Sequence, residues 1–498
     1  MAEDKTGFND PIHGYMEFDP LLVAIIHTPC FQRMKDIKQL GASYWIFPGA
    51  SHNRFEHSLG TAHLAGMMIE RLKDVHKRDK KTTDRNHQHY ITDEEVLCVK
   101  IAALCHDLGH GPFSHVFDTR MKTKLIEYHK NEIHRLSDEQ CEDDDKNYHG
   151  AQAKKLNDWE HEDASCAMFD HILKTTDGLK DAFAEKKLGE KEQKLIKNII
   201  KGKHPAEDDI TEVPTTLDGK LKKWFLFEIV ANKIYEVDCD KFDYFARDCH
   251  NLGMKSNFDY LRYINNIQIK LLDGDGGLHL CPRDKLVFNI YELFHTRWSL
   301  HHRAYQHKTT KAVEEMITDA LILLEEKYKF SEAIFDMEKY SKLTDSIFYE
   351  ILRSNDTDEK TKKAQEILER IQRRKLYKLY GEFQPDKKLN IDDLEAAAEE
   401  IAKLSGGLVK ANELFVSIVK IHFGKEDQDP VKSVIFYNKD GDIADSRSGD
   451  DVSRMLPQKF SEQYVRLYGT DIDSDMKKEI AKECFEKWNA KYKSNSDD

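Results

Sequence analysis

The chain has 498 residues, 40% of them hydrophobic and 33% charged, which is enough apolar material for a large core with an attached lobe. Asp and Glu (90) outnumber Lys and Arg (76), so the formal net charge is −14 and a general nucleic-acid-binding surface is disfavoured. The longest apolar run, residues 21–26, is much shorter than the about 18 residues that cross a bilayer, and no secretion signal begins the chain. The nine cysteines form no Cys-x-x-Cys pair, which predicts reduced thiols in an intracellular protein without a membrane partner.

Helical signals dominate the first half of the sequence. The segment 94–108 is a nearly all-apolar helix that we expect to be buried, and the Gly- and Pro-containing segment 109–112 ends it. In chain order we further predict helix and loop over 21–60, an amphipathic helix over 61–72, an exposed loop over 74–88, an acidic surface loop over 132–158, a helix over 163–174, and a charged helix followed by a loop over 184–209.

Two later segments indicate β-hairpins. Residues 267–271 and 278–280 alternate in polarity on both sides of a Gly-rich turn, and residues 434–437 precede the turn-forming segment 438–442. After about residue 340 the composition shifts to charge-rich helices. We therefore expect a mainly α protein with small β-hairpins, a catalytic core over 1–340 and an α+β C-terminal lobe over 341–498.

The segment 106–115 is the most informative one for chemistry, because it places a His-Asp pair at the end of an apolar helix. Burying a carboxylate there costs free energy unless it is paired or binds a metal. A backbone carbonyl can satisfy one structural histidine, but His106 is adjacent to Asp107, and His110 and His115 follow. A metal site explains this cluster better than a structural hydrogen-bond network, which is the alternative interpretation.

Further metal ligands are expected from distant segments. His57 lies one helical turn after Arg54, and Asp240 begins an i, i+4, i+8 stripe with Tyr244 and Asp248. The alternative for that stripe is an amphipathic helix with solvated acids. The combined ligand set suits iron, zinc, manganese or nickel, and such an ion makes hydroxide available at neutral pH. The proposed metal ligands are His57, His106, Asp107 and Asp240.

Two further patterns point to a phosphate-rich substrate. His161 and Glu162 are adjacent candidates for proton transfer. Residues 293–313 contain no acidic residue, and a helix places Arg297, His301, Tyr305 and Lys308 on one face. A charge run is usually a solvated surface, but an aromatic side chain inside a basic stripe favours phosphate and base or sugar binding. A metal hydroxide beside such a stripe predicts phosphoester hydrolysis.

These motifs, together with segments 8–14, 47–58, 243–250 and 303–308, resemble the HD-domain deoxynucleoside triphosphate (dNTP) triphosphohydrolases that pair a sterile-alpha-motif domain with an HD domain. The resemblance runs from about residue 8 to about residue 468, and no sterile-alpha-motif domain precedes it, so we expect the HD core of a longer type of protein. It implies a multi-helix HD-domain phosphohydrolase core. It also implies hydrolysis of a dNTP to a deoxynucleoside and inorganic triphosphate by attack at the α-phosphorus.

The resemblance also implies roles for individual residues. The metal ligands are those proposed above, with iron or zinc as the first choice, and Mg²⁺ accompanies the nucleotide phosphates. The implied catalytic residues are His161, Glu162, His110, His115 and Asp240, with His115 suited to protonate the leaving 5′ oxygen. The resemblance implies that Gln39 and Asp248 contact the 3′-hydroxyl of the sugar, that Leu40 and Tyr305 form the wall that excludes a 2′-hydroxyl, and that Arg54, Lys241, Tyr244 and Arg297 hold the phosphates. The other implied substrate-binding residues are His110, His115 and Gln306.

Members of the resembled family are activated by GTP and dNTPs that bridge subunits into a homotetramer, a dimer of dimers. This implies roles in dNTP catabolism and antiviral defence, and a nuclear location with the cytoplasm as the alternative. The implied activator-binding residues are Asn9, His27, Gln32, Lys35, Phe47, Arg262, Arg283, Lys285, Asn289, His307, Lys308, Arg374, Lys378 and Lys439.

One departure from the family concerns the first activator site, where His27 replaces Asp and Lys35 replaces Arg. An Asp carboxylate accepts both N–H groups of a guanine edge, whereas neutral imidazole offers one acceptor. Lys also lacks the planar fork of Arg. We therefore predict a relaxed or altered base preference for activation.

Two other functions remain open at the level of sequence. An HD phosphodiesterase or nuclease differs in its products, because only the triphosphohydrolase releases intact triphosphate. A non-enzymatic module that binds single-stranded nucleic acid through the basic segment 293–313 would bind without the metal site and weaken steeply with salt.

Overall fold

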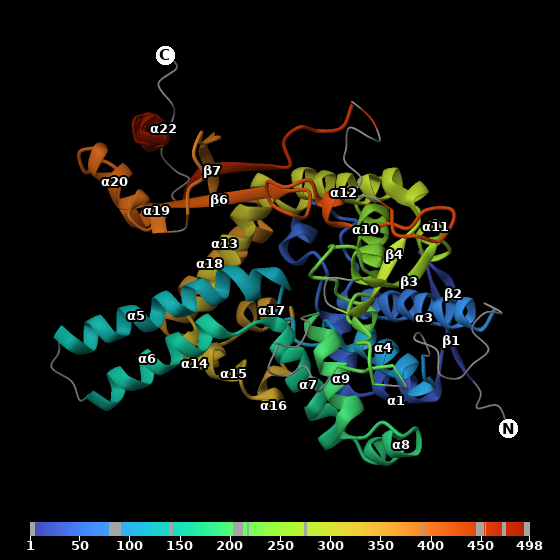
Figure 1. Cartoon of the computed structure of the whole chain (residues 1–498). Helices are drawn as coiled ribbons and strands as arrows, with labels where there is room; N and C mark the ends of the chain where they lie inside the picture. The colour runs from blue at the N-terminus through green and yellow to red at the C-terminus, as the bar shows by residue number, and fades with distance from the viewer. Residues whose placement is uncertain are drawn as a thin grey trace.

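The computed structural model describes residues 5–78, 91–138, 143–202, 213–216, 219–272, 276–390, 392–444, 453, 455–470 and 475–492. Helices make up most of the described chain and are accompanied by small antiparallel sheets, which confirms the predicted fold class (Figure 1). Among the described residues, no helix is long and apolar enough to cross a membrane.

Three helices frame the centre of the core: α3 (Arg54–Arg78), α4 (Asp93–Cys105) and α10 (Cys239–Asn251). Helix α3 packs against both α4 and α10. Helix α4 begins with a capping box in which the side chains of Thr92 and Glu95 each accept the other's backbone N–H. Nine of the thirteen residues of α4 are buried, among them all five from Ile101 to Cys105, so the predicted buried helix is confirmed and its C-terminus lies inside the protein.

Two hairpins lie on this core. Strands β1 (Thr6–Asp10) and β2 (Gly14–Phe18) pair antiparallel, with Phe8 opposite Met16. Strands β3 (Ile267–Leu272) and β4 (Gly277–Pro282) form the first predicted hairpin, and part of its turn, 273–275, lies outside the described residues.

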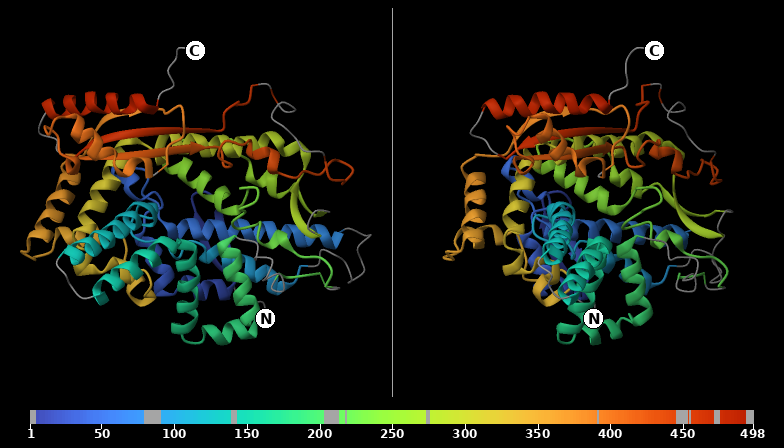
Figure 2. Two further views of the ribbon diagram at one scale, coloured as in Figure 1. Left: turned by 60° about the vertical axis from the view of Figure 1, so that its left-hand side comes forward. Right: turned by 90° about the vertical axis from the view of Figure 1, so that its left-hand side faces the viewer.

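A third sheet forms in the C-terminal part of the chain, with the strand order β5-β7-β6. Its strands are β5 (Lys378–Phe383), β6 (Leu414–His422) and β7 (Ser461–Gly469). Figure 2 shows this sheet as a layer between α22 (Asp475–Asn489) and α12 (Val287–Leu300). Its α22 side holds a separate hydrophobic cluster that includes Val465, Phe485 and Trp488.

The predicted surface loop over 132–158 is wrong. The structure has a helical hairpin there, α5 (Lys122–Asp138) and α6 (Asp143–Asp158), which projects from the body of the protein (Figure 1). Few apolar residues hold the two helices together, among them the buried Leu136 and Leu156. Most of the other positions are polar and at least partly exposed, which is why composition alone indicated a loop.

Other predicted boundaries also shift. Helix α3 continues through the first part of the predicted loop 74–88, to Arg78, and residues 79–88 lie outside the described residues. The charged helix predicted from residue 184 begins only at Glu190, as α9 (Glu190–Lys201), and residues 203–209 of the predicted loop are also not described.

The second predicted hairpin, over 434–442, is reduced to one isolated bridge between Tyr437 and Ile443. The backbone of Tyr437 instead pairs with the end of β4, because its N–H donates to the Pro282 carbonyl and its carbonyl accepts from the Asp284 N–H. Competition from this neighbouring backbone explains why the local turn signal did not produce two strands.

The described chain contains further helices. They are α1 (Pro20–Ile26), α2 (Pro29–Gln32), α7 (His161–Thr175), α8 (Leu179–Glu185), α11 (Tyr260–Ile264), α13 (Lys308–Ile322), α14 (Glu325–Tyr328), α15 (Phe330–Ala333), α16 (Met337–Tyr340), α17 (Ile347–Leu352), α18 (Glu359–Gln372), α19 (Asp392–Glu395) and α20 (Ala397–Leu404). Short 3₁₀ turns cover Arg33–Asp36, Gly41–Trp45, Trp224–Leu226, Asp284–Leu286, Ala411–Glu413, Pro430–Ser433 and Ala490–Tyr492.

Candidate metal centre and active site

The proposed metal ligands come together from three helices. His57 lies in the first turn of α3, His106 and Asp107 directly follow α4, and Asp240 lies in the first turn of α10. The Nε2 atoms of His57 and His106 are 3.2 Å apart. Oδ1 of Asp240 lies 3.1 Å from Nε2 of His57 and 3.4 Å from Nε2 of His106. The Asp107 carboxylate lies 3.4 Å from each of the two Nε2 atoms.

The hydrogen bonds of the two imidazoles show that these four groups fit a cation. Nδ1 of His57 lies 2.7 Å from the Asp243 carboxylate, and Nδ1 of His106 donates to the Ala103 carbonyl at 2.7 Å. In the neutral rings both Nε2 atoms are therefore lone-pair donors, and they face each other and two carboxylates. An ion about 2.1 Å from each ligand sets ligand–ligand distances of about 3.0–3.4 Å, as observed here.

The electrostatics of the cluster favour a positive charge at its centre. Burial disfavours an imidazolium, but hydrogen bonds with Asp240 and Asp243 outweigh it and raise the pKa of His57 to about 10. Burial also opposes ionisation of Asp107, yet Arg54 and His106 hold the pKa of Asp107 well below its usual range. The carboxylates therefore favour a positive charge at this point, either a proton on His57 or a bound cation that displaces this proton and leaves the two rings neutral.

A second layer of buried charge supports His57, and sequence reasoning assigned it no role. Asp243 accepts from His57 with Oδ2, from His13 with Oδ1, and from the Arg247 guanidinium. Arg247 in turn donates to Asp10 of β1. Gly60 permits this approach, because a Cβ at that position would lie 1.8 Å from Asp243 Oδ1. The spacing of Asp243 from Asp240, one helical turn, is the signal that could have found it.

Arg54 connects the metal cluster to the following loop. Its Nη1 donates to Asp107 Oδ2 at 2.5 Å, and its Nε donates to Ser114 Oγ at 2.9 Å. Arg33 binds the backbone of the same loop, because its guanidinium donates to the carbonyls of Leu108 and His110. These contacts link the loop after α4 to helix α3 and to the 3₁₀ turn that begins at Arg33.

A histidine group lies beside the cluster. The rings of His110 and His161 stack with their centroids 4.1 Å apart, and Nε2 of His110 lies 3.2 Å from Asp107. Nδ1 of His161 lies 3.3 Å from the Glu162 carboxylate. The predicted His-Glu pair and the predicted metal cluster are therefore neighbours.

Asp118 organises this histidine group and was missed by sequence reasoning. It lies in a π-helical segment, Val116–Met121, and its Oδ2 is 2.5 Å from Nδ1 of His110. Burial opposes its ionisation, but His110 lowers the pKa of Asp118 to about 2. Desolvation and the positive charge of Arg54 lower the pKa of His115, although its side chain is largely exposed. The i+3 spacing of Asp118 from His115 was the available signal.

The residues implied to bind the sugar also meet. The Tyr305 hydroxyl donates to Asp248 Oδ2 at 2.5 Å, and His52 Nε2 lies 2.6 Å from Asp248 Oδ1. Gln39 is buried, and its Oε1 has no hydrogen-bond partner among the described residues. A buried acceptor without a partner costs free energy, which a donor such as a sugar hydroxyl would relieve.

The predicted basic stripe forms over Arg297, His301 and Tyr305 but does not extend to Lys308. Arg297 lies near the end of α12, and its Nη1 is 2.8 Å from His301, whose ring contacts Tyr305 at a centroid distance of 5.0 Å. The segment His301–Tyr305 is π-helical, and Lys308 starts the separate helix α13. The predicted single helical face through Lys308 is therefore wrong, because the π-helical turns and the break before α13 change the residue periodicity.

The other implied phosphate ligands surround Asp240. Lys241 follows it in α10, and its Nζ pairs with Glu236 at 3.0 Å and with Asp238 at 2.9 Å. The Tyr244 ring lies 6.2 Å from the His57 ring.

Arg297 Nη2 also lies 3.4 Å from His422, the last residue of β6. The C-terminal sheet thus contributes a side chain to this side of the site. Gln306 engages the sheet as well, since its carbonyl accepts from Arg466 at 2.5 Å.

Comparisons with known proteins agree with this geometry. An HD domain is matched over residues 54–218 and an HD associated region over residues 291–433. The chain is 41% identical over 485 residues to deoxynucleoside triphosphate triphosphohydrolase SAMHD1 of Homo sapiens, covering 93% of this chain and 70% of that protein. It is 41% identical to SAMHD1 of Gallus gallus (97% of this chain, 74% of that protein) and 32% identical to a SAMHD1 homolog of Dictyostelium discoideum (92% and 76%).

The chain belongs to the SAMHD1 family of deoxynucleoside triphosphate triphosphohydrolases. The matched HD domain begins at Arg54 and includes three of the four clustered metal-ligand candidates, with Asp240 following it in the chain. The matched HD associated region includes the basic stripe and His422. Both matched regions therefore contribute to the site.

The implied activator-binding residues of this SAMHD1-family chain lie in separate groups. In one group, the Phe47 ring contacts the His307 ring at 5.5 Å, Lys308 follows His307, and Arg374 donates to the Trp45 carbonyl. In another part of the chain, Arg283 lies over the Tyr437 ring, and Asn289 exchanges two hydrogen bonds with the backbone of Asp259. The remaining positions are Asn9 on β1, Arg262, Lys285, Lys378, Lys439, and the trio His27, Gln32 and Lys35 around α2.

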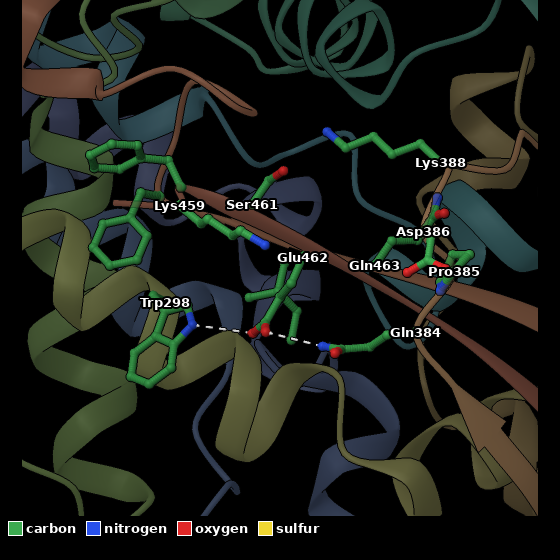
Figure 3. Close-up of a pocket in the computed structure, with 12 residues that line it drawn as sticks. Trp298, Gln384, Pro385, Asp386, Lys388, Lys459, Ser461, Glu462 and Gln463 are labelled. Carbon is green, nitrogen blue, oxygen red and sulfur yellow. Dashed lines mark hydrogen bonds between the residues drawn. The ribbon is translucent and has the colours of Figure 1, made fainter. Parts of the chain in front are cut away.

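A further hollow lies on the C-terminal sheet (Figure 3). It is lined by Trp298, Gln384, Lys388, Lys459, Phe460 and Glu462, among others. Trp298 Nε1 donates to Glu462 Oε1 at 3.3 Å, and Gln384 Nε2 donates to Oε2 of the same carboxylate at 3.5 Å. None of the metal-ligand candidates lines this hollow, so it is separate from the metal centre.

Proposed function

We propose that this protein is a metal-dependent dNTP triphosphohydrolase that releases a deoxynucleoside and inorganic triphosphate by attack at the α-phosphorus. The observation that carries the proposal is the convergence of His57, His106, Asp107 and Asp240 on one small space beside the His161–Glu162 pair. Membership of the SAMHD1 family supports the substrate class. The core, residues 1–340, would supply the chemistry, and the C-terminal lobe, 341–498, would contribute to activation and assembly.

The four clustered residues would hold a transition-metal ion, iron or zinc first and manganese or nickel next. Such an ion, when bound, supplies Lewis-acid polarisation of a phosphoryl oxygen and makes water more nucleophilic at neutral pH. We infer that Mg²⁺ enters with the nucleotide phosphates.

The chain's own residues would orient the substrate and transfer protons. Arg54, Lys241, Tyr244 and Arg297 would bind phosphate oxygens. His161, polarised by Glu162, would accept a proton from the attacking water. His115 is neutral in the free protein, and the negative charge of a bound triphosphate would raise its pKa so that it can donate a proton to the 5′ oxygen. His110, held by Asp118, would bind the α-phosphate.

The sugar would be held by its 3′-hydroxyl. Gln39 Oε1 has no donor among the described residues, and the Asp248 carboxylate is held by His52 and Tyr305. Leu40 and the Tyr305 ring would form a wall against C2′, and Gln306 would flank that wall. A wall of this kind rejects an added hydroxyl both sterically and by offering it no partner.

We further propose that GTP or dNTP activators bridge subunits into a homotetramer and that the enzyme controls dNTP pools. The separated, surface-lying groups around Phe47, Arg283 and Lys35 support this, because sites completed by a second subunit need not be closed within one chain. Antiviral defence, a nuclear location and binding of single-stranded nucleic acid belong to the same proposal as expectations from the family.

Turnover of dGTP with and without a chelator tests the catalytic proposal. We expect deoxyguanosine and intact triphosphate, no turnover with chelator, and loss of turnover in a folded Asp107→Ala variant. Asp170→Ala is a matched control, because Asp170 makes an ion pair with Lys197 away from the cluster and should leave turnover unchanged. Release of a nucleoside monophosphate or of pyrophosphate would favour the phosphodiesterase alternative. Metal-independent, salt-sensitive nucleic-acid binding without turnover would favour the binding module.

A further inference from the structure

Two backbone segments meet beside the metal centre, residues 38–41 and residues 111–115. The first contains Gln39 and Leu40, which the proposed function places against the sugar. The second leads into His115. Gly41 lets the two backbones touch, because a Cβ there would lie 2.3 Å from the Phe113 carbonyl oxygen. The distance between the sugar wall and the histidine group therefore depends on how these segments are joined.

The second segment has a strained backbone. Phe113 (φ 60°) and Ser114 (φ 55°) are consecutive non-glycine residues in the left-handed region. Such conformations cost free energy and persist only where the surroundings hold them. Their position immediately before His115 means that relaxation of the strain would move a proposed catalytic residue.

One carboxylate joins the two segments. Asp345 precedes α17, and its own N–H donates to the Asp36 carbonyl at 3.0 Å. Its Oδ2 accepts from the Lys38 N–H at 2.9 Å, and its Oδ1 accepts from the Phe113 N–H at 2.5 Å. Desolvation raises the pKa of Asp345 to about 6, which leaves the carboxylate ionised at neutral pH. Both oxygens are thus committed to backbone groups, one on each segment.

A hydroxyl provides a second bridge between the same segments. Ser114 Oγ donates to the Lys38 carbonyl at 2.6 Å and accepts from Arg54 Nε at 2.9 Å. Lys38 is therefore held on both of its backbone polar groups, its N–H by Asp345 and its carbonyl by Ser114. The residues that follow it, Gln39 and Leu40, have little freedom to move away from the histidine group.

We infer that Asp345 is a positioning residue that sets the preference for deoxyribose over ribose, an inference that rests on the proposed function. By bridging Lys38 and Phe113, it keeps the Leu40 wall at a fixed distance from His115. Rejection of a 2′-hydroxyl requires that the Leu40 side chain stays close to C2′ of the sugar. A gap of about one oxygen atom between them would admit the hydroxyl. Asp345 touches neither the sugar nor the reacting phosphate in this arrangement.

The test compares dCTP with CTP as substrates, at one fixed concentration of GTP, in wild-type protein and in Asp345→Asn. The two substrates carry the same triphosphate, so any change in phosphate binding cancels in the ratio of their kcat/KM values. Asn keeps the size of Asp but places an NH₂ group against one of the two N–H donors, which opens one bridge. We expect the dCTP-to-CTP ratio to fall by about tenfold, close to what a hydrophobic wall contributes against one hydroxyl.

Two further variants complete the design. Ser114→Ala removes the hydrogen bond from Ser114 Oγ to the Lys38 carbonyl and should lower the dCTP-to-CTP ratio as well. If Asp345→Asn does not fold, the Ser114→Ala variant alone tests the inference. Asp336→Asn is the control, because Asp336 also caps two backbone N–H groups, those of Glu338 and Lys339, but at the start of α16. It should leave the ratio unchanged.

The outcomes are distinguishable. A wild-type protein that turns over dCTP, with Asp345→Asn or Ser114→Ala variants that keep the wild-type ratio, overturns this inference alone. A folded wild-type protein that turns over no dNTP overturns the proposed function and this inference with it. A ratio that falls equally in Asp336→Asn shows a general loss of rigidity and also overturns the role of Asp345.

Discussion

His57 and Asp243 are joined by a hydrogen bond of 2.7 Å that sets which nitrogen of the imidazole faces the metal cluster. Asp243 is itself buried and is held by His13 and Arg247. The orientation of a metal ligand in this protein therefore depends on a carboxylate that is not a ligand. Such outer partners typically contribute about 10–100-fold to metal affinity.

We predict that Asp243→Asn lowers metal affinity by about 10–100-fold, because Asn is a weaker acceptor and leaves His57 free to rotate. Metal content per purified chain, with titration of iron and zinc, measures the effect. Asp259→Asn is a suitable control, since Asp259 caps α11 rather than the metal ligands. Full metal occupancy at the wild-type affinity in Asp243→Asn would show that the hydrogen bond does not orient His57.

Gln39 offers a test of sugar binding. Its Oε1 is buried without a partner among the described residues, so Gln39→Ala should leave the thermal midpoint unchanged or slightly raise it. Substrate binding should weaken, because the 3′-hydroxyl loses its acceptor. The preference for dGTP over 2′,3′-dideoxy-GTP, measured as a ratio of kcat/KM, should fall by about tenfold, which corresponds to about 1.4 kcal/mol. An unchanged ratio would remove Gln39 from the proposed sugar contacts.

The first activator site is predicted to have a relaxed base preference, because His27 and Lys35 stand where the family has Asp and Arg. Lys35 is exposed, with its Nζ over the Phe55 ring at 4.7 Å. Turnover of dCTP with GTP, with ATP and without an activator measures this preference. We expect ATP to support turnover in wild type and the double variant His27→Asp, Lys35→Arg to require GTP. Strict dependence on GTP in wild type would contradict the prediction.

Glu325 gives a prediction about stability and pH that is independent of the active site. It is buried, accepts from the Ser331 N–H and hydroxyl, and has one oxygen without a partner among the described residues. Burial raises the pKa of Glu325 to about 6, above its ordinary value of 4.5. The pKa of Glu325 is higher in the folded state than in the unfolded state. The folded protein is therefore most stable, as far as Glu325 is concerned, below pH 4.5, where the carboxyl is protonated in both states. This contribution to the free energy of unfolding is lost as the pH rises through about 6.

Glu325→Gln should therefore stabilise the protein at neutral pH by up to about 2 kcal/mol and have little effect near pH 4.5. Thermal unfolding of wild type and variant across this pH range measures the difference. Glu326→Gln is the neighbouring control, because the Glu326 side chain is exposed and forms an ion pair with the exposed Lys360. A destabilised Glu325→Gln variant at neutral pH would show that the ionised carboxylate is favourable where it lies.

The sequence was informative wherever neighbouring residues carry the signal. The apolar composition of the segment before His106 predicted a buried helix, and it is α4. The alternating segments 267–271 and 278–280 predicted the hairpin of β3 and β4. It was less informative where few contacts hold an element, as in α5 and α6, because a sparse apolar face looks like a polar loop in composition.

The sequence by itself determined which side chains can do the chemistry: His57, His106, Asp107 and Asp240 were identified from their residue types and motifs. Only the tertiary structure decided what holds the site together, because Asp243 meets His57, Asp118 meets His110 and Asp345 meets the Phe113 N–H through contacts that helix periodicity does not predict. Local patterns record helix periodicity and burial. They do not record which distant backbone N–H or imidazole a carboxylate meets, since the packing of α3, α4, α10 and the C-terminal sheet sets those distances.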